Sequence, residues 1–585
     1  MGALIHLIKN ASKPKYTTFL ILTFYTLGME NKFRKRNKRF GNIKERKNFG
    51  FGKNKPFQSK RPESFEKFIS PDKANLCDIT ATNKGQSFSV SGNVDRIVQT
   101  GGPTIFYVSD GTATLALKAF EGAGVRSYPD IEVDDVIEAS ITIEEFNGEL
   151  EGEVKRLKKI VEDEKEEFLK KLAKIEKERA KVNVIPFLVQ SSILDKLKDL
   201  IIQAATEIRL AIIQNRPIII RHHNDTDGYS SGYALERAIL PLITKQHTSV
   251  KSAWEFYTRA PCNAPMYEID DSIRDTAHSL AAVAKFSNRM PLVIIVDTGS
   301  GEEDLLGIQQ GKVHGIDFIV VDHHLFEEDV ISKEVLVHIN PFLVGESGSK
   351  FSAGMLCTEL ARFINPVENI IQIPAMAGMA DRTDNPEVIK AYVHLAEKKG
   401  YNKELLGDIA TVIDFVSSKL RFMEAREYIE VLFGEPMEKQ RALVNLLAPY
   451  IKNLELKGLK IAETAVKIEE IKGLTLQVLD IENTFSRGFY PKPGRCTSLI
   501  HDSIQEKKKI KKVVTLGCMN DAITIRASED ANFSVQEVIN YLNKHIPQAF
   551  VEGGGHKNAG SIRFVPVKQK EVMELIRKYL KEKEN

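Results

Sequence analysis

Three short apolar runs, each followed at once by acidic residues or histidine, most constrain how this chain can fold. The runs end at residues 220, 296 and 321, and the segments HHNDTDG, DTGS and DHH follow them. Continuous apolar runs are typical of parallel strands that are buried on both faces. Because helical patterns alternate with these runs, residues 185–395 are predicted to form a parallel sheet covered by helices. Ligands of such sheets bind beyond the carboxyl ends of the strands, so the polar segments predict a site at that edge.

The polar residues after the strands are of the types that bind divalent cations. In HNDTDG, the alternation of His223, Asp225 and Asp227 places three side chains on one side of an extended or turning chain. Taken singly, an Asp after a strand is often a helix N-cap, and a lone His is more often a core residue. Further candidates follow the other strands or lie in AGMADRTDN: Asp297, Asp322, His323, His324 and Asp381.

This number of carboxylates in one cleft indicates bound metal. Packing them together is costly unless cations neutralise them. Oxygen ligands mixed with imidazole, without thiolate, suit Mn²⁺ or Mg²⁺ better than structural zinc. The many acids favour two ions about 3.5–4 Å apart that share one carboxylate, activate a water and clamp a phosphate.

The same residues carry a resemblance to a known family. Four motifs of this chain resemble, in order and spacing, those of the DHH phosphoesterase superfamily. They are His223-x-Asp225-x-Asp227-Gly228, Asp297, Asp322-His323-His324 and Gly378-x-Ala380-Asp381. A further segment resembles the glycine-rich motif of the DHHA1 domain found in that superfamily. It is Gly553-Gly554-Gly555-His556-Lys557-Asn558-Ala559-Gly560. The motifs span residues 220–564, and within the superfamily the chain resembles RecJ-like single-strand exonucleases, particularly archaeal ones.

The resemblance implies a role for each matching residue. Asp297 is expected to bridge the two ions, and His324 to touch the scissile phosphate. Asp322 is expected to orient an imidazole. His222 is an additional histidine without an assigned role. The residues that match metal ligands are His223, Asp225, Asp227, Asp297, His323 and Asp381.

The glycine-rich segment and three arginines are candidates for binding phosphate. Successive glycines allow backbone N–H groups to approach an anion as a nest, with a plain glycine-rich turn as the alternative. Arg526 resembles the family's substrate-holding arginine, whereas Arg487 and Arg495 are weaker candidates. The candidates in the glycine-rich segment are Gly553, Gly554, Gly555, His556 and Lys557.

Further domains flank the predicted catalytic one. Residues 76–160 hold β-rich runs split by Gly-containing turns, which resembles an OB-fold barrel; such barrels bind single strands or serve as protein adaptors. Its candidate contacts are Phe106, Tyr107, Lys118 and Phe120. The other expected segments are a charged linker helix at 153–182, a helical connector at 396–458 with no recognisable chemistry, and an α+β DHHA1 domain at 459–585 that binds substrate.

Residues 1–70 are expected to be a disordered basic arm. Residues 32–61 hold 13 Lys/Arg and one Glu, whereas the whole chain has a formal net charge of +3, which leaves about −9 for the rest. The arm is either a solubilising tail or a non-specific nucleic-acid contact, in which its phenylalanines would stack on bases. These phenylalanines are Phe33, Phe40, Phe49 and Phe51.

The N-terminus and the cysteines bear on the compartment. Apolar residues 16–28 are too short for a spanning helix and resemble a signal peptide, but translation from Met29 is the preferred explanation. Five scattered cysteines without a CxxC pair fit a reducing compartment, so we expect a cytoplasmic protein without a membrane partner.

Together these features predict an exonuclease that uses two Mn²⁺ or Mg²⁺ ions to hydrolyse single-stranded DNA, RNA or both. One alternative is a phosphodiesterase for short oligonucleotides or cyclic dinucleotides. Another is a replication-associated scaffold that binds DNA without cutting it. Replication or repair proteins are the expected partners. The OB-like region precedes the catalytic domain here but follows DHHA1 in bacterial RecJ, so the relatives' polarity and substrate preference are not carried over.

Overall fold

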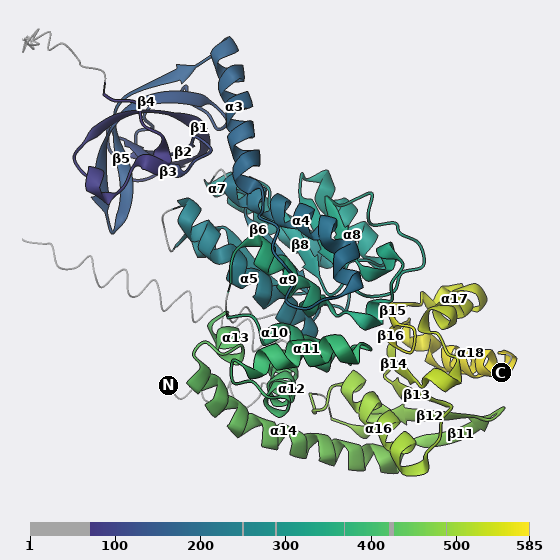
Figure 1. The fold of residues 1–585 in the computed structure, drawn as a ribbon. Coiled ribbons are helices and arrows are strands. Elements are labelled where there is room, and N and C mark those ends of the chain that lie inside the picture. Colours follow the sequence, from purple (N-terminus) through teal and green to yellow (C-terminus); the bar gives the residue numbers. More distant parts are fainter. Residues whose placement is uncertain are drawn as a thin grey trace, which may run out of the picture. The chain divides into compact units, whose positions relative to one another are not determined.

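The computed structural model describes residues 71–247, 251–286, 289–367, 369–420, 426–486 and 488–583. The basic arm with its phenylalanines, the Met29 start and Arg487 lie outside the described residues. Three regions follow in chain order: a β-barrel, a parallel-sheet domain and an α+β domain (Figure 1). This architecture confirms the predicted fold class. No helix in the described part of the chain is both long and apolar enough to cross a membrane.

The first region is a closed barrel with the strand order β1-β2-β3-β5-β4. Alternation along each strand decides which side chains face inward. Phe106 is fully buried, so its expected role as a strand contact is wrong, whereas Phe120 is 68% exposed. The strands are β1 (Ser87–Gln99), β2 (Thr104–Ser109), β3 (Thr114–Ala119), β4 (Val136–Phe146) and β5 (Glu149–Ile160).

Two other expected barrel contacts are already engaged within the protein. The Arg96 guanidinium lies 4.0 Å from the centre of the Tyr107 ring. Lys118 pairs with Glu151, and its Nζ lies 4.3 Å from the centre of the Phe146 ring. Of the four candidates, Phe120 is therefore the one that remains open to a ligand.

A charged helix, α3 (Glu162–Ala180), connects the barrel to the next domain. Residues 153–160, which the charge pattern extended into this helix, belong to β5 instead. They are held there because β5 pairs with β4 along its whole length. The helix begins only where that pairing ends.

The parallel sheet has the order β10-β9-β8-β6-β7, and every neighbouring pair is parallel. The three apolar runs form β6 (Ile218–His222), β8 (Leu292–Val296) and β9 (Asp317–Val321), and the structure adds β7 (Tyr257–Pro261) and β10 (Val337–Ile339). In β8, Ile294 packs into one hydrophobic core cluster and Val293 into another on the opposite face. This burial on both faces explains the continuous apolar runs.

Helices cover both faces of this sheet (Figure 1). Short loops from the sheet edge lead directly into several of them, so helix N-termini stand beside the strand ends. The helices are α4 (Ser192–Ile213), α5 (Thr226–His247), α6 (Ser252–Glu255), α7 (Ile269–Phe286), α8 (Glu302–Val313), α9 (Ala353–Ile364), α10 (Ile373–Ala380) and α11 (Pro386–Glu397).

Three helices connect to the C-terminal domain: α12 (Lys403–Leu420), α13 (Arg426–Leu432) and α14 (Met437–Ala465). That domain has a mixed sheet of order β11-β12-β13-β14-β16-β15, so β15 is an edge strand. Its strands are β11 (Lys467–Ile471), β12 (Leu474–Asp480), β13 (Val513–Cys518), β14 (Ala522–Ala527), β15 (Glu552–His556) and β16 (Ala559–Arg563). Its helices are α15 (Ile481–Thr484), α16 (Pro493–Lys508), α17 (Val535–His545) and α18 (Gln569–Glu582).

Candidate metal centre

The loop between β6 and α5 brings the first two candidate ligands together. His223 Nδ1 lies 3.0 Å from Asp225 Oδ2, and the Gly228 N–H donates to Asp225 Oδ1 at 3.0 Å. A Cβ at Gly228 would lie 2.1 Å from the His223 carbonyl oxygen, so a glycine is required where the chain folds back. Burial alone would raise the pKa of Asp225, but His223 holds it well below its usual range.

Asp227 lies in the first turn of α5 and is held by the start of α9. Its carboxylate accepts hydrogen bonds from Ser352 Oγ at 3.0 Å, the Ala353 N–H at 2.9 Å and the Gly354 N–H at 2.8 Å. Despite these donors, burial and the charge of Asp297 raise the pKa of Asp227 well above its ordinary value. A further positive charge is needed for this group to ionise readily.

Asp297 follows β8 directly and lies between the other ligands. Its φ is 59°, a left-handed conformation that Asp and Asn adopt more readily than most residues. Its Oδ1 lies 3.2 Å from His323 Nε2 and its Oδ2 3.6 Å from His223 Nδ1. Yet Asp297 Oδ2 and His323 Nε2 are buried without a well-oriented hydrogen-bond partner in the described structure. Asp297 and the two histidines thus direct oxygen and nitrogen atoms at one another over 3.2–3.6 Å without forming well-oriented hydrogen bonds. Ligands of a common metal ion are arranged in this way.

His323 presents one particular ring nitrogen to the site. Its Nδ1 lies 3.2 Å from the Gly348 carbonyl oxygen, which favours the proton on Nδ1. The Nε2 lone pair then faces the carboxylates, and a hydrogen bond of this kind is what orients a metal-binding imidazole.

The candidate ligands form two groups joined by Asp297. Each group offers three donor atoms within 4.8 Å of one another, and both lie at the carboxyl edge of the parallel sheet. Burial raises the pKa of Asp381 to about 6, although His323 opposes the shift. Crowded carboxylates and bare imidazole nitrogens fit two divalent cations. The groups are His223, Asp225 and Asp297, and Asp227, His323 and Asp381.

Beside these groups lies a histidine positioned by Asp322. His324 Nδ1 lies 2.8 Å from Asp322 Oδ1, which also accepts the His323 N–H at 2.7 Å. Burial would lower the pKa of His324, but Asp322 raises it. Asp322 therefore favours an imidazolium whose Nε2 is free to donate to an anion.

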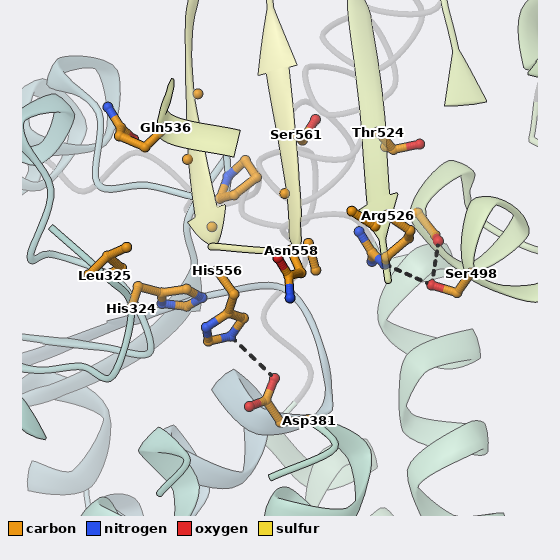
Figure 2. Close-up of a pocket in the computed structure, with 18 of the residues that line it drawn as sticks. His324, Leu325, Asp381, Ser498, Thr524, Arg526, Gln536, His556, Asn558 and Ser561 are labelled. Carbon is orange, nitrogen blue, oxygen red and sulfur yellow. Dashed lines mark hydrogen bonds and ion pairs between the residues drawn. The ribbon is translucent and has the colours of Figure 1, made fainter. Parts of the chain in front are cut away.

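The C-terminal domain supplies the facing wall. His556, at the end of β15, stacks on His324 with ring centres 4.9 Å apart, and its Nε2 lies 3.9 Å from Asp381 Oδ1. Figure 2 shows the tip of the β15–β16 hairpin, which carries His556, directed at His324 and Asp381. Between the two domains lies a cleft of about 1380 Å³, with candidate ligands His223, Asp225 and Asp381 among its lining residues.

The glycine-rich segment is a strand and not a turn. A Cβ at Gly553 would lie 2.2 Å from the Ser561 carbonyl oxygen, and one at Gly555 2.5 Å from that of Ala559. These glycines therefore permit close pairing with β16. Gly554 has open space at its Cβ position and, like its two neighbours, lines the cleft. As an edge strand, β15 leaves one row of backbone N–H and C=O groups unpaired.

The remaining substrate candidates differ in availability. Arg526 lines the cleft and is held by Ser498 Oγ, which accepts from its Nε at 3.0 Å. Arg495 lines it too, but it is committed to Glu455 by two bonds of 2.7 and 3.1 Å. Lys557 is exposed in the β15–β16 turn, outside the lining residues.

The structure adds two residues that the sequence did not single out. Asp414 of α12 accepts from the Thr226 N–H at 3.1 Å and from Thr226 Oγ1 at 2.9 Å, so it supports the ligand loop. Lys492 Nζ donates to the Asn224 carbonyl oxygen and to Ser417 Oγ, both at 3.1 Å. The helical connector thus does carry chemistry. Only the position of Asp414 on a buried helical turn could have suggested this.

Comparison with known proteins identifies the family. The model of the DHH family N-terminal domain matches residues 217–379. An uncharacterized protein of Methanocaldococcus jannaschii, MJ1198, is 36% identical over 512 residues, which is 82% of this chain and 67% of that protein. A solved DHH domain, described as part of a member of a family of ribosomal proteins, is also 36% identical, with a TM-score of 0.68, over 72% of this chain and 99% of that one.

RecJ of Thermus thermophilus in complex with Mn²⁺ is a more distant structural neighbour. It is 16% identical with a TM-score of 0.48, over 70% of this chain and 57% of that one. A likeness this distant says nothing of the chain's activity. On the family model and the relatives that share 36% of their residues, the chain belongs to the RecJ-like DHH superfamily of phosphoesterases.

Proposed function

We propose that this protein is a divalent-metal-dependent phosphodiesterase that hydrolyses single-stranded nucleic acid from an end. The observation that carries the proposal is the pair of ligand groups at one side of a large cleft, which Asp297 links: it belongs to the first group, and its Oδ1 lies 3.2 Å from His323 Nε2 of the second. Cations are needed there because the crowded acids leave a buried carboxylate oxygen without a partner. Two Mn²⁺ or Mg²⁺ ions would activate a water and neutralise the phosphoryl oxygens.

The chain's own groups would complete the site around a phosphate. His324, whose pKa is raised by Asp322, would donate from Nε2 to a phosphoryl oxygen. Arg526, oriented by Ser498, and the cleft-lining glycines of the edge strand β15 would hold a neighbouring phosphate from the facing wall. His556, stacked on His324, would cover part of the metal groups from the facing wall.

The net charge of the barrel does not favour the strand-holding role that its OB-like pattern suggests. Residues 71–160 contain 9 Lys/Arg and 15 Asp/Glu, a formal net charge of −6. Polyanion binding depends on Lys and Arg that displace counterions, so this charge opposes it. The described barrel exposes two phenylalanines, Phe120 and Phe146, and Lys118 Nζ already lies over the Phe146 ring. Phe120 is therefore the side chain through which the barrel would stack a base, and we assign the barrel at most that auxiliary contact.

The test is cleavage of matched single-stranded DNA and RNA, labelled at either end, with Mn²⁺, with Mg²⁺ and with EDTA. Release of mononucleotides from one end, only with metal, is the expected result and identifies both the sugar and the direction. Hydrolysis of dinucleotides without cleavage of longer strands would instead support the short-oligonucleotide enzyme. Tight binding of strands without cleavage under any condition would contradict catalysis and favour a scaffold.

A further inference from the structure

The cleft continues well beyond the metal groups along helix α16. Cleft-lining residues recur on one face of this helix at intervals of one or two turns and continue into the turn that follows it. From the first to the last they are 15 positions apart, or about 22 Å at 1.5 Å per residue. These residues are Gly494, Arg495, Ser498, His501, Asp502, Gln505 and Lys509.

The start of this helix is held at the metal groups. Lys492, the residue before α16, donates to the carbonyl oxygen of Asn224, which lies between candidate ligands His223 and Asp225. Figure 2 shows Ser498, farther along α16, beside Arg526. The lining face therefore runs from the metal groups past Arg526 to the far end of the helix.

The far end carries a cluster of lysines, Lys508, Lys509, Lys511 and Lys512, which we call the lysine rim. All four are exposed, and their side chains make no hydrogen bond or ion pair with the described residues. Their neighbour Lys507, by contrast, is neutralised by Glu463. Lys509 ends α16 in a left-handed conformation, φ 53°, and both it and Lys511 line the cleft.

Acidic residues elsewhere in the cleft limit where a polyanion could bind. Glu529 and Asp530 also line the cleft but pair with none of the rim lysines. Their two negative charges equal the two positive charges of Lys509 and Lys511, which line the cleft, and Lys508 and Lys512 add two positive charges outside the lining. The DHH-domain side carries a further set of lining acids, which a polyanion would avoid. That set is Glu302, Glu303, Glu327 and Glu328.

We propose that the lysine rim binds phosphates of the same strand whose scissile phosphate lies at the metal groups. This inference rests on the proposed function and narrows its substrate to strands long enough to reach about 22 Å along α16. Lysine binds phosphate as a point charge without reading sequence, which suits a strand that must slide through. A dinucleotide held at the metal groups does not reach the rim.

The test compares the double variant Lys509→Glu/Lys511→Glu with Lys457→Glu/Lys460→Glu in the full chain. Lys457 and Lys460 are exposed on α14, outside the cleft, so the control makes the same change of net charge. The probes are DNA and RNA strands of about twelve nucleotides and the matching dinucleotides. The readouts are the long-to-short ratio of kcat/KM with Mn²⁺ and the salt dependence of long-strand binding in EDTA.

The rim variant is expected to lower the long-to-short ratio about tenfold. It should also reduce the slope of log affinity against log salt by about 1.4, because two phosphate contacts on a single strand are lost. The control should match the wild type in both. If the rim variant keeps the wild-type long-to-short ratio of kcat/KM and the wild-type salt slope, the inference is wrong. The rim would then be assigned to binding an acidic protein partner. If the wild type cleaves neither probe, the proposed function fails, while the salt slope still decides the rim.

Discussion

Buried carboxylates occur in two regions of this protein under opposite conditions. At the junction of the barrel with the DHH domain, Asp95 accepts from Asn215 at 2.6 Å, from Asn93 at 2.9 Å and from Arg289 at 3.2 Å. At the sheet edge, Asp297 has a buried oxygen without a hydrogen-bond partner and further carboxylates around it. Burial of an acid therefore does not by itself indicate a site. What distinguishes the sheet edge is that several acids crowd one another there and that Asp297 Oδ2 is buried without a hydrogen-bond partner among the described residues.

The largest effect is expected from Asp297→Asn, which tests this comparison directly. Asparagine tolerates the left-handed backbone at this position, so the change removes charge with little strain. Cleavage should fall by about 10³-fold or more. In EDTA, however, the free energy of unfolding should rise by about 1–2 kcal/mol, because one of several mutually repelling acids is gone. Single-turnover cleavage and denaturant unfolding, each with EDTA and with Mn²⁺, measure both effects.

Mn²⁺ should also stabilise the wild type more than this variant, since ligand binding to the folded state adds stability by mass action. A variant that keeps full cleavage, or that is destabilised in EDTA as a junction residue would be, would show that Asp297 is a structural acid.

A smaller effect is expected from Asp414→Ala, which removes the two hydrogen bonds from Thr226 that hold the ligand loop. Loss of such outer support typically costs about 10–100-fold in metal affinity. Cleavage at saturating Mn²⁺ should largely recover, because the ligands themselves remain. The Mn²⁺ concentration at half-maximal activity and the Mn²⁺-induced thermal shift both report this affinity.

Asp408→Ala is the matched control, since Asp408 lies on the same helix but pairs with the half-exposed Lys452 at 2.6 Å. Equal Mn²⁺ requirements in the two variants would mean that Asp414 serves only to pack α12.

The contrast between the two regions also explains what could be predicted from the sequence. The ligand side chains follow apolar runs that are complete within a few residues, so local pattern is enough to place them at one sheet edge. Asp414 meets Thr226 across 188 positions of sequence, and no local pattern encodes that contact. Similarly, nothing near Lys492 indicates that it reaches the ligand loop.

Register and strand pairing also explain where the structure differs from local interpretations of the barrel and of the glycine-rich segment. Phe106 is one of four candidate contacts whose orientation depends on strand register, and barrel closure turns it inward while its neighbour Tyr107 remains partly exposed. From the sequence, the glycine-rich segment is expected to be either a phosphate nest or a plain turn. Its pairing with β16 across the hairpin makes it a strand, and that pairing is a property of the tertiary fold.

The smallest effect is expected from Asp95→Asn, the same chemical change as in the first test but at the junction. Burial raises the pKa of Asp95 from 3.8 to about 6, although Arg289 opposes the shift. A carboxyl with a raised folded-state pKa binds its proton more tightly when folded. Its contribution to stability is therefore complete below pH 3.8 and is lost as the pH rises through about 6. Asparagine does not titrate, so the unfolding free energy of wild type minus variant should fall by about 2–3 kcal/mol across that window. Other titrating acids, including Asp381, are common to both proteins and cancel in the difference.

Cleavage should be unchanged, because Asp95 lies outside the cleft. A difference that stays constant with pH would mean that Asp95 is ionised throughout, and that Arg289 and the amides satisfy it as a charge.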